Sequence, residues 1–302
     1  IRPGNRGGGR GEHSTVDAPR KARRTGRIPQ MDTVDDVPAA LARRPLFEPI
    51  APWLARFTAP GVPAHAALDA LLAETAGEAR SGGGAPIRFV PPADDPAGYE
   101  AQIFNRGEVP TRSGNWHDFF NALAWCAWPQ SKAACNRLHL DELRARTAAG
   151  LAGRGRRRDA LTQFDECGIV VVSSDAAIAG RLAAHAWHDA FWLERSRLLQ
   201  TTRFLVFGHG SWDQLRAPFF GLCAKALYRV VSDEWHNLDE RTRLSDTDAW
   251  LASQLRARIE HLTPRDFSPL PLLGIPGVVP DSESADYYLD TRQFRPRREH
   301  AA

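Results

Sequence analysis

The sequence predicts an α+β protein in which a mostly helical single domain surrounds a small, partly parallel sheet. Three observations predict this class. Apolar residues recur at helical spacing over much of the chain. Two short apolar runs, Ile169–Val172 and Phe204–Phe207, are typical of buried strands. From Pro264 onward the chain is rich in proline, which favours an extended tail that wraps the domain.

The first half of the chain is expected to be mainly helical. Apolar spacing predicts helices over 46–57, 63–75, 115–128 and from 129 to about 149. Pro129 separates the last two, because proline interrupts helical hydrogen bonding. Between these helices, the segment Ser81–Gly84 predicts a flexible connection, and Ile87–Val90 predicts a short strand stopped by two prolines.

The second half alternates between helices and strands. A helix over 159–166 precedes the first strand, and Ser174 or Asp175 can cap a long helix after it. The apolar residues of that long helix are Ile178, Leu182, Ala186, Ala190 and Leu193. After the second strand, Gly208–Ser211 predicts a tight turn with Ser211 as the cap of the next helix. This order predicts a crossover unit, and a final amphipathic helix covers 246–261.

The composition limits the class of protein. With 302 residues, 43% hydrophobic and 25% charged, the chain can bury a sizeable core. These figures exclude a collagen, a disordered chain and a small disulfide scaffold. No uncharged stretch reaches the roughly 18 residues of a membrane-spanning helix, so no membrane partner is expected. The four cysteines show no zinc-type spacing and no secretory signal is found, which predicts a cytoplasmic protein.

Positive charge is concentrated at the start of the chain. Residues 1–30 are rich in Gly and Arg and carry a net charge of +6, whereas residues 31–302 carry −3. The only methionine is Met31. We therefore expect residues 1–30 to be a disordered leader upstream of the natural start, and residues 31–302 to form one domain with its core at about 45–299. Because that domain is mildly acidic, nucleic acid is not favoured as a partner.

Several segments together resemble one family. They are Glu108–Arg112, Asn115–Leu123, Arg158–Gly168, Phe207–His209, Pro269–Gly277 and Phe294–Pro296. This ordered set is similar to a proteobacterial family known as domain of unknown function 3025, and the resemblance covers most of the chain from about residue 40. It implies no established activity, so the chemistry has to be interpreted from the residues themselves.

The first candidate site lies at the start of the predicted helix over 115–128. His117 and Asp118 are adjacent, and such pairs hold a divalent metal in phosphohydrolases because imidazole and carboxylate are both good ligands. Asn121 lies one turn later on the face of His117, where it can contact a substrate. In the structural alternative, Asn115 and Asp118 cap the helix and His117 is hydrogen-bonded within the core.

The second candidate site is the predicted helix over 159–166. Its polar face consists of Asp159, Thr162, Gln163 and Glu166, and Asp165 and Glu166 directly precede a buried strand. We expect Asp165 and Glu166 to act as metal ligands or as a general base, and Asp159 to contact the substrate. A solvated amphipathic face would show the same pattern.

The third candidate is His209, which lies between two glycines after the second predicted strand. Ligands gather outside the carboxyl ends of strands in α/β sheets, so His209 is well placed to be a further metal ligand. The flanking glycines allow close backbone approach or a positive φ. The alternative is a purely structural tight turn.

Arginines offer sites for an anion. Six of them lie between Arg144 and Arg158, at the start of a helix whose dipole disfavours cations unless a negative charge compensates. We expect Arg158 and Arg112 to hold an anionic substrate. Ion pairs with Asp159, or with Asp141 and Glu142, are the structural alternative.

These candidates together predict a cytoplasmic metal-dependent hydrolase of a phosphate-containing or other anionic small molecule. His117, Asp118 and His209 would hold a divalent metal ion. The main alternative is a non-catalytic structural or interaction protein whose polar residues form a buried network. A weaker alternative is nucleic-acid binding through the arginines of 144–158. A shared site requires His117 or Asp118 to lie near the helix over 159–166, with His209 within reach of both.

Overall fold

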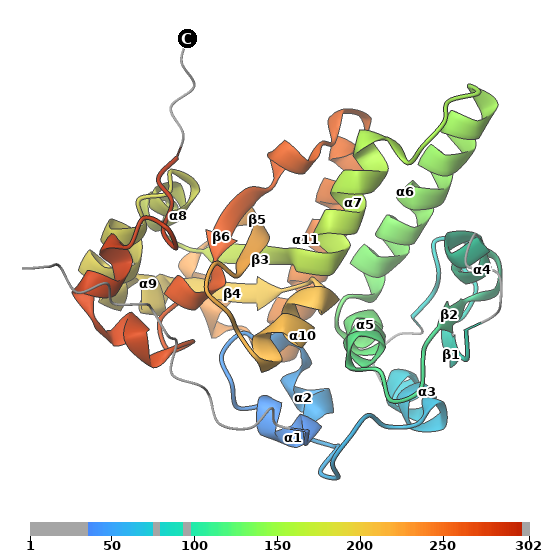
Figure 1. Ribbon diagram of the computed structural model, residues 1–302, viewed down its shortest axis with the longest axis horizontal. Helices are drawn as coiled ribbons and strands as arrows, with labels where there is room; N and C mark the ends of the chain where they lie inside the picture. Colours follow the sequence, from blue (N-terminus) through green and yellow to red (C-terminus); the bar gives the residue numbers. More distant parts are fainter. Residues whose placement is uncertain (1–35, 75–78, 93–97, 298–302) are drawn as a thin grey trace, which may run out of the picture. The chain divides into compact units, whose positions relative to one another are not determined.

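The computed structural model of the chain describes residues 36–74, 79–92 and 98–297. Within these ranges the predicted α+β class is confirmed, because helices predominate and the strands form two small sheets (Figure 1). The predicted leader, residues 1–30, lies outside the described residues. None of the helices in the described ranges has the length and the apolar composition that a bilayer crossing requires.

A four-stranded sheet with the strand order β4-β3-β5-β6 is the larger of the two. Its strands are β3 (Gly168–Ser173), β4 (Thr202–Val206), β5 (Cys223–Val230) and β6 (Ser268–Pro271). The two strands predicted here are confirmed as β3 and β4. The expected crossover is corrected, however: β4 runs antiparallel to β3, and the parallel partner of β3 is β5. Strand β5 was not predicted, because Lys225, Tyr228 and Arg229 interrupt its apolar pattern.

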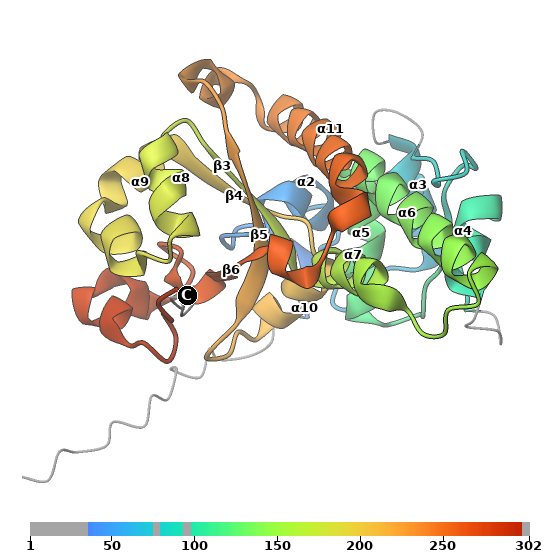
Figure 2. The same cartoon turned by 90° about the horizontal axis from the view of Figure 1, so that it is seen from above.

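Helices cover both faces of this sheet, so every residue of β3 is buried. Figures 1 and 2 show α7 (Gly155–Cys167) and α10 (His209–Arg216) on one side, and α8 (Ala176–Ala183) and α9 (Arg195–Thr201) on the other. Beyond α7, α6 (Pro129–Ala148) packs against α11 (Glu240–Arg258), and α5 (Trp116–Ala127) packs against α10. The helices predicted over 115–128, 129–149, 159–166 and 246–261 are thereby confirmed, with α7 and α11 each starting earlier than expected.

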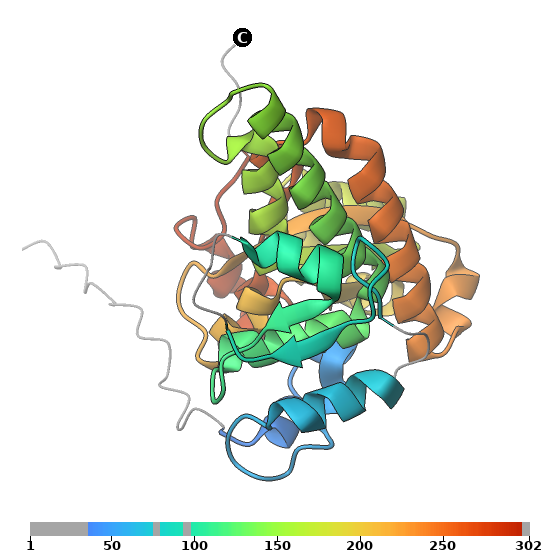
Figure 3. The same cartoon turned by 90° about the vertical axis from the view of Figure 1, so that its right-hand side faces the viewer.

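The smaller sheet is a parallel pair of strands, β1 (Arg88–Val90) and β2 (Glu108–Pro110), which faces the viewer in Figure 3. Helix α4 (Tyr99–Arg106) lies between the two strands in the sequence. The predicted strand over 87–90 is confirmed, and α3 (His65–Glu74) packs beside it. The prediction of a flexible connection at Ser81–Gly84 was wrong, because this segment is closely packed. A Cβ at Gly82 would lie 2.6 Å from the backbone nitrogen of Arg137, so glycine serves close packing against α6 here.

The helix predicted over 46–57 was also wrong in extent. The structure has a 3₁₀ turn, Glu48–Ile50, and then the short α2 (Ala51–Leu54), preceded by α1 (Pro38–Leu41). Two prolines, Pro49 and Pro52, lack the backbone N–H groups that a continuous helix needs. Leu46, which was expected to start the helix, has a φ of 71°.

The single long helix expected over the residues from Ile178 to Leu193 is broken into two parts. Asp175 caps α8 by accepting hydrogen bonds from the N–H groups of Ala177 and Ile178, as expected. The chain then turns at His185, whose φ is 61°, and continues as a π-helical turn, Asp189–Leu193. Leu193 is consequently 65% exposed rather than buried. Apolar spacing cannot detect such a break, because the next helical turn resumes a similar period.

Two further expectations are corrected near the ends of strands. Gly208–Ser211 is not a separate turn: Gly208 is the N-cap residue of α10, and Ser211 lies inside that helix. In the described part of the tail after Pro264, β6 pairs with β5 as a strand, and several short 3₁₀ turns occupy much of the rest.

Candidate functional site

The register of β3 and β4 brings two candidate residues together. Ile169 of β3 lies opposite Val206 of β4, and the two strands are antiparallel, so β3 begins beside the end of β4. Glu166 lies in the last turn of α7, just before β3, and His209 is the first residue of α10, just after β4. The fold therefore places these two side chains at one edge of the sheet.

Two glycines permit this close approach. The N–H of Gly208 donates to the carbonyl of Gly168 at 2.9 Å, and a Cβ at Gly208 would lie 2.5 Å from Cα of Cys167. A Cβ at Gly210 would lie 2.6 Å from Oε2 of Glu166. Neither glycine has a positive φ, so the first of the two expected roles, close backbone approach, is the one observed.

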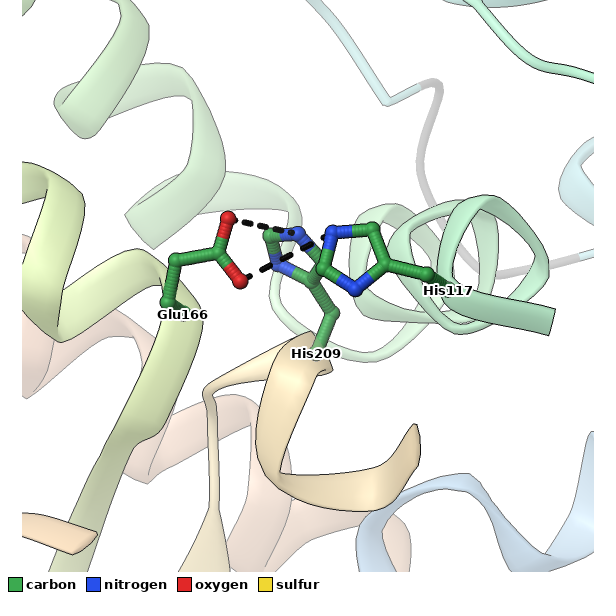
Figure 4. Close-up of side chains that lie close together, drawn as sticks. All are labelled: His117, Glu166 and His209. Carbon is green, nitrogen blue, oxygen red and sulfur yellow. Dashed lines mark ion pairs between the residues drawn. The ribbon is translucent and has the colours of Figure 1, made fainter. Parts of the chain in front are cut away.

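Helix α5 contributes the third side chain. Asn115 caps this helix by accepting a hydrogen bond from the N–H of Asp118, and His117 lies in the first turn. Because α5 packs against α10, the rings of His117 and His209 lie with their centroids 4.6 Å apart, inclined by 64°. Figure 4 shows both rings directed toward the carboxylate of Glu166.

His117, Glu166 and His209 form a group with metal-ligand geometry. One ligand atom from each residue lies within 4.8 Å of the others. Nε2 of His117 is 3.7 Å from Oε2 of Glu166, and Nε2 of His209 is 3.6 Å from Oε1. Ligands of a tetrahedral zinc ion, with bonds near 2.0–2.1 Å, lie about 3.4 Å apart. The two histidine–glutamate distances exceed this value by only a few tenths of an ångström, while the group as a whole lies within 4.8 Å.

The second ring nitrogen of each imidazole, Nδ1, also lies near a carboxylate. Nδ1 of His209 is 3.7 Å from Oδ2 of Asp165, and Nδ1 of His117 is 4.0 Å from Oδ2 of Asp213. Within the described part of the chain, the buried Nδ1 of His209 has no hydrogen-bond partner. Histidines that bind metals commonly present their second nitrogen to a carboxylate, which fixes the ring and its tautomer.

Burial differs across the group. The side chain of His209 is only 6% exposed, and this burial lowers its pKa to about 3, so the ring is neutral at physiological pH. The side chains of His117 and Glu166 are 34% and 43% exposed. Burial still raises the pKa of Glu166, although the neighbouring His117 opposes that shift. The group thus has one buried side chain and two side chains that solvent can reach.

Asp165 lies against a buried lysine. Nζ of Lys132 donates to Oδ1 of Asp165 at 2.6 Å and to Oδ1 of Asn121 at 2.9 Å. Burial alone would raise the pKa of Asp165, but the charge of Lys132 and the nearby His209 outweigh it, and the pKa is lowered. Asp165 therefore faces His209 as a carboxylate.

The structure does not bring every predicted site residue to this group. Both carboxylate oxygens of Asp118 accept hydrogen bonds from the guanidinium of Arg112, at 2.8 and 2.9 Å, so these two expected site residues pair with each other. Asp159 is exposed at the start of α7. Arg158 is half-buried on α7, and its Nε has no hydrogen-bond partner within the described residues.

Sequence reasoning missed two residues of the site. Asp213 lies one helical turn after His209 on α10, a spacing that was open to detection. Lys132 is one of only three lysines in an arginine-rich chain, and that rarity was a signal. Its partner Asp165 lies 33 residues away, so the pairing itself required the fold.

A partly buried carboxyl group on α4 should make stability depend on pH. Burial raises the pKa of Glu100 to about 7, although the amide of Asn136 donates to its carboxylate at 2.8 Å. A raised folded-state pKa means that the contribution to stability is fully present below pH 4.5 and is lost as the pH rises through 7. Glu100→Gln should therefore gain about 2–3 kcal/mol over the parent between pH 5 and pH 8 in urea unfolding. A constant difference at both pH values would contradict this expectation.

The fold and the site together define an α+β protein with a candidate metal centre formed by His117, Glu166 and His209. The family model described as "Protein of unknown function (DUF3025)" matches residues 87–298. The chain belongs to this family, as the resemblance of its sequence segments had implied. The match spans all three residues of the centre. Comparison with curated proteins and with solved structures found no match.

Proposed function

We propose that this protein is a metal-dependent hydrolase whose divalent ion is held by His117, Glu166 and His209. One observation carries the proposal: two imidazoles and one carboxylate converge within 4.8 Å, from three different helices. Two histidines and a glutamate are the protein ligands of one class of catalytic zinc site. Structural zinc sites are instead closed by a fourth protein ligand, and the described residues supply only three here.

The exposure of His117 and Glu166 supports an open coordination position. A water molecule bound there would have a pKa lowered to about 7 and would supply the nucleophile. A divalent ion with one carboxylate ligand keeps a net positive charge, which favours a phosphate-containing or other anionic substrate. The four cysteines are all free, which supports a cytoplasmic location because that compartment keeps thiols reduced.

Metal analysis and a substrate comparison test the proposal. The purified full chain should contain close to one zinc, manganese or cobalt ion per molecule. It should hydrolyse p-nitrophenyl phosphate or bis-p-nitrophenyl phosphate faster than the neutral p-nitrophenyl acetate. A chelator should abolish turnover, and added metal should restore it. A protein that neither contains nor takes up a divalent metal at micromolar concentration would rule the proposal out.

The pairing of expected site residues with protein partners favours one other function. Lys132 is bound to Asp165 and Asn121, as in a buried network that specifies a fold, and the exposed Arg112 is bound to Asp118. In a non-catalytic structural or interaction protein, these pairs would hold the fold together. Metal uptake without turnover of any of the three nitrophenyl substrates would favour this second function, with the metal in a structural role.

A further inference from the structure

The ion pair between Lys132 and Asp165 is unusual for its burial. The side chain of Lys132 is 6% exposed and that of Asp165 is 24% exposed. Nζ of Lys132 bonds Asp165 and Asn121, and it lies 5.7 Å from the ring centre of Trp125. A buried ion pair is often no more stabilising than apolar residues of the same volume, because both charges lose their hydration. Stabilisation of the fold is therefore a weak explanation for the presence of this ion pair.

The two oxygens of Asp165 face different partners. Oδ1 accepts from Lys132, and Oδ2 lies 3.7 Å from Nδ1 of His209. The opposite nitrogen of the same ring, Nε2, lies 3.6 Å from Glu166. A carboxylate that faces Nδ1 favours the tautomer with the proton on that nitrogen and leaves the lone pair of Nε2 free.

We propose that Lys132 and Asp165 are positioning residues that hold His209 as a metal ligand through its Nε2. Lys132 keeps Asp165 in place and compensates its charge, and Asp165 orients the ring. The inference rests on the proposed metal centre and adds two residues that do not touch the metal. His117 differs: its own carboxylate neighbour, Asp213, is 35% exposed and lies farther away, at 4.0 Å. His209 is thus the preorganised ligand of the group.

Cobalt(II) titration of the full chain tests this inference, because the visible spectrum of bound cobalt reports its coordination geometry. Asp165→Asn and Lys132→Met should each weaken cobalt binding about 10- to 100-fold and change the intensity of the visible bands. Lys132→Arg keeps the positive charge and should recover much of the affinity. Asp246→Asn is the matched control, since Asp246 is held by Arg229 at 2.7 Å and by Trp235 at 2.8 Å, away from the site. It should lower stability and leave the cobalt spectrum unchanged.

The outcomes separate the two proposals. If the parent protein binds no cobalt, the metal centre itself fails. If the parent binds cobalt and Asp165→Asn binds it equally well with the same spectrum, the metal centre stands and the positioning role is overturned. If a single variant does not fold, the double variant Asp165→Asn/Lys132→Met decides, because it leaves no lone buried charge. Parental affinity in that double variant would overturn the positioning role.

Discussion

Replacement of His209 by Gln is expected to weaken zinc binding by more than about 100-fold. Removal of a residue that orients a metal ligand lowers metal affinity about 10- to 100-fold, and removal of the ligand itself should lower the affinity further. Zinc at one hundred times its dissociation constant stabilises the folded parent by about 2.7 kcal/mol, which raises its melting temperature by several degrees. His209→Gln should show no such zinc-dependent rise at the same concentration. His117→Asn should behave in the same way.

A second buried histidine provides the control. His139 on α6 is 5% exposed, as His209 is, and its Nδ1 also has no hydrogen-bond partner within the described residues. It is not part of the metal-ligand group. His139→Gln should therefore keep the full zinc-dependent rise in melting temperature. Loss of that rise in His139→Gln would show that the effect comes from the disturbance of a buried histidine rather than from the loss of a ligand.

The metal-free melting temperature separates a functional site from a structural network. Groups held for chemistry are only partly paired, so their replacement costs the fold little. In the structure, the Nδ1 of His209 lacks a hydrogen bond and the nearest carboxylate oxygens lie at 3.6 and 3.7 Å. We expect metal-free His209→Gln to melt at the parental temperature or above it. A loss of about 1–3 kcal/mol without metal would favour the network, because buried partners would be left unpaired.

Local sequence signals were sufficient for α5 and β3, although the start of α10 was predicted as a separate turn. The apolar period and the cap at Asn115 predict α5, and the run Ile169–Val172 predicts β3. His117, Glu166 and His209 were all among the expected site residues. They could be found because each is a polar side chain at the end of a strongly patterned element.

The set of candidate metal ligands could not be predicted from residues that are adjacent in the sequence. His117 and Asp118 are neighbours in sequence, yet successive residues of a helix point about 100° apart. His117 consequently faces α10, whereas Asp118 faces Arg112, six residues before it. The carboxylate that meets the imidazoles comes instead from Glu166, 49 residues after His117. The pairing of β3 with β4 places Glu166 beside His209, and the packing of α5 against α10 brings His117 to both. A single sequence contains no direct signal for such a long-range pairing.

Alanine substitutions at the two glycines beside His209 are expected to affect different properties, although the glycines are only two residues apart. Gly208→Ala would place a methyl group 2.5 Å from Cα of Cys167 and against the backbone of Gly168. Backbone atoms cannot rotate away, so α10 must separate from the start of β3. We expect a loss of about 3 kcal/mol or more in the free energy of unfolding, measured by urea denaturation.

Gly210→Ala should spare the fold and damage the site. Its methyl group would lie 2.6 Å from Oε2 of Glu166, 3.0 Å from the backbone carbonyl oxygen of Glu166 and 3.6 Å from Cε1 of His117. The carbonyl contact requires a shift of only a few tenths of an ångström. The glutamate side chain can swing away, and alanine is favoured over glycine inside a helix by about 0.5–1 kcal/mol, so stability should change little. Zinc affinity should fall at least 10-fold, because the displaced carboxylate no longer meets both imidazoles. Equal zinc affinity in Gly210→Ala and the parent would mean that Glu166 is not a ligand, whereas the stability of Gly208→Ala tests the backbone contact independently of any metal.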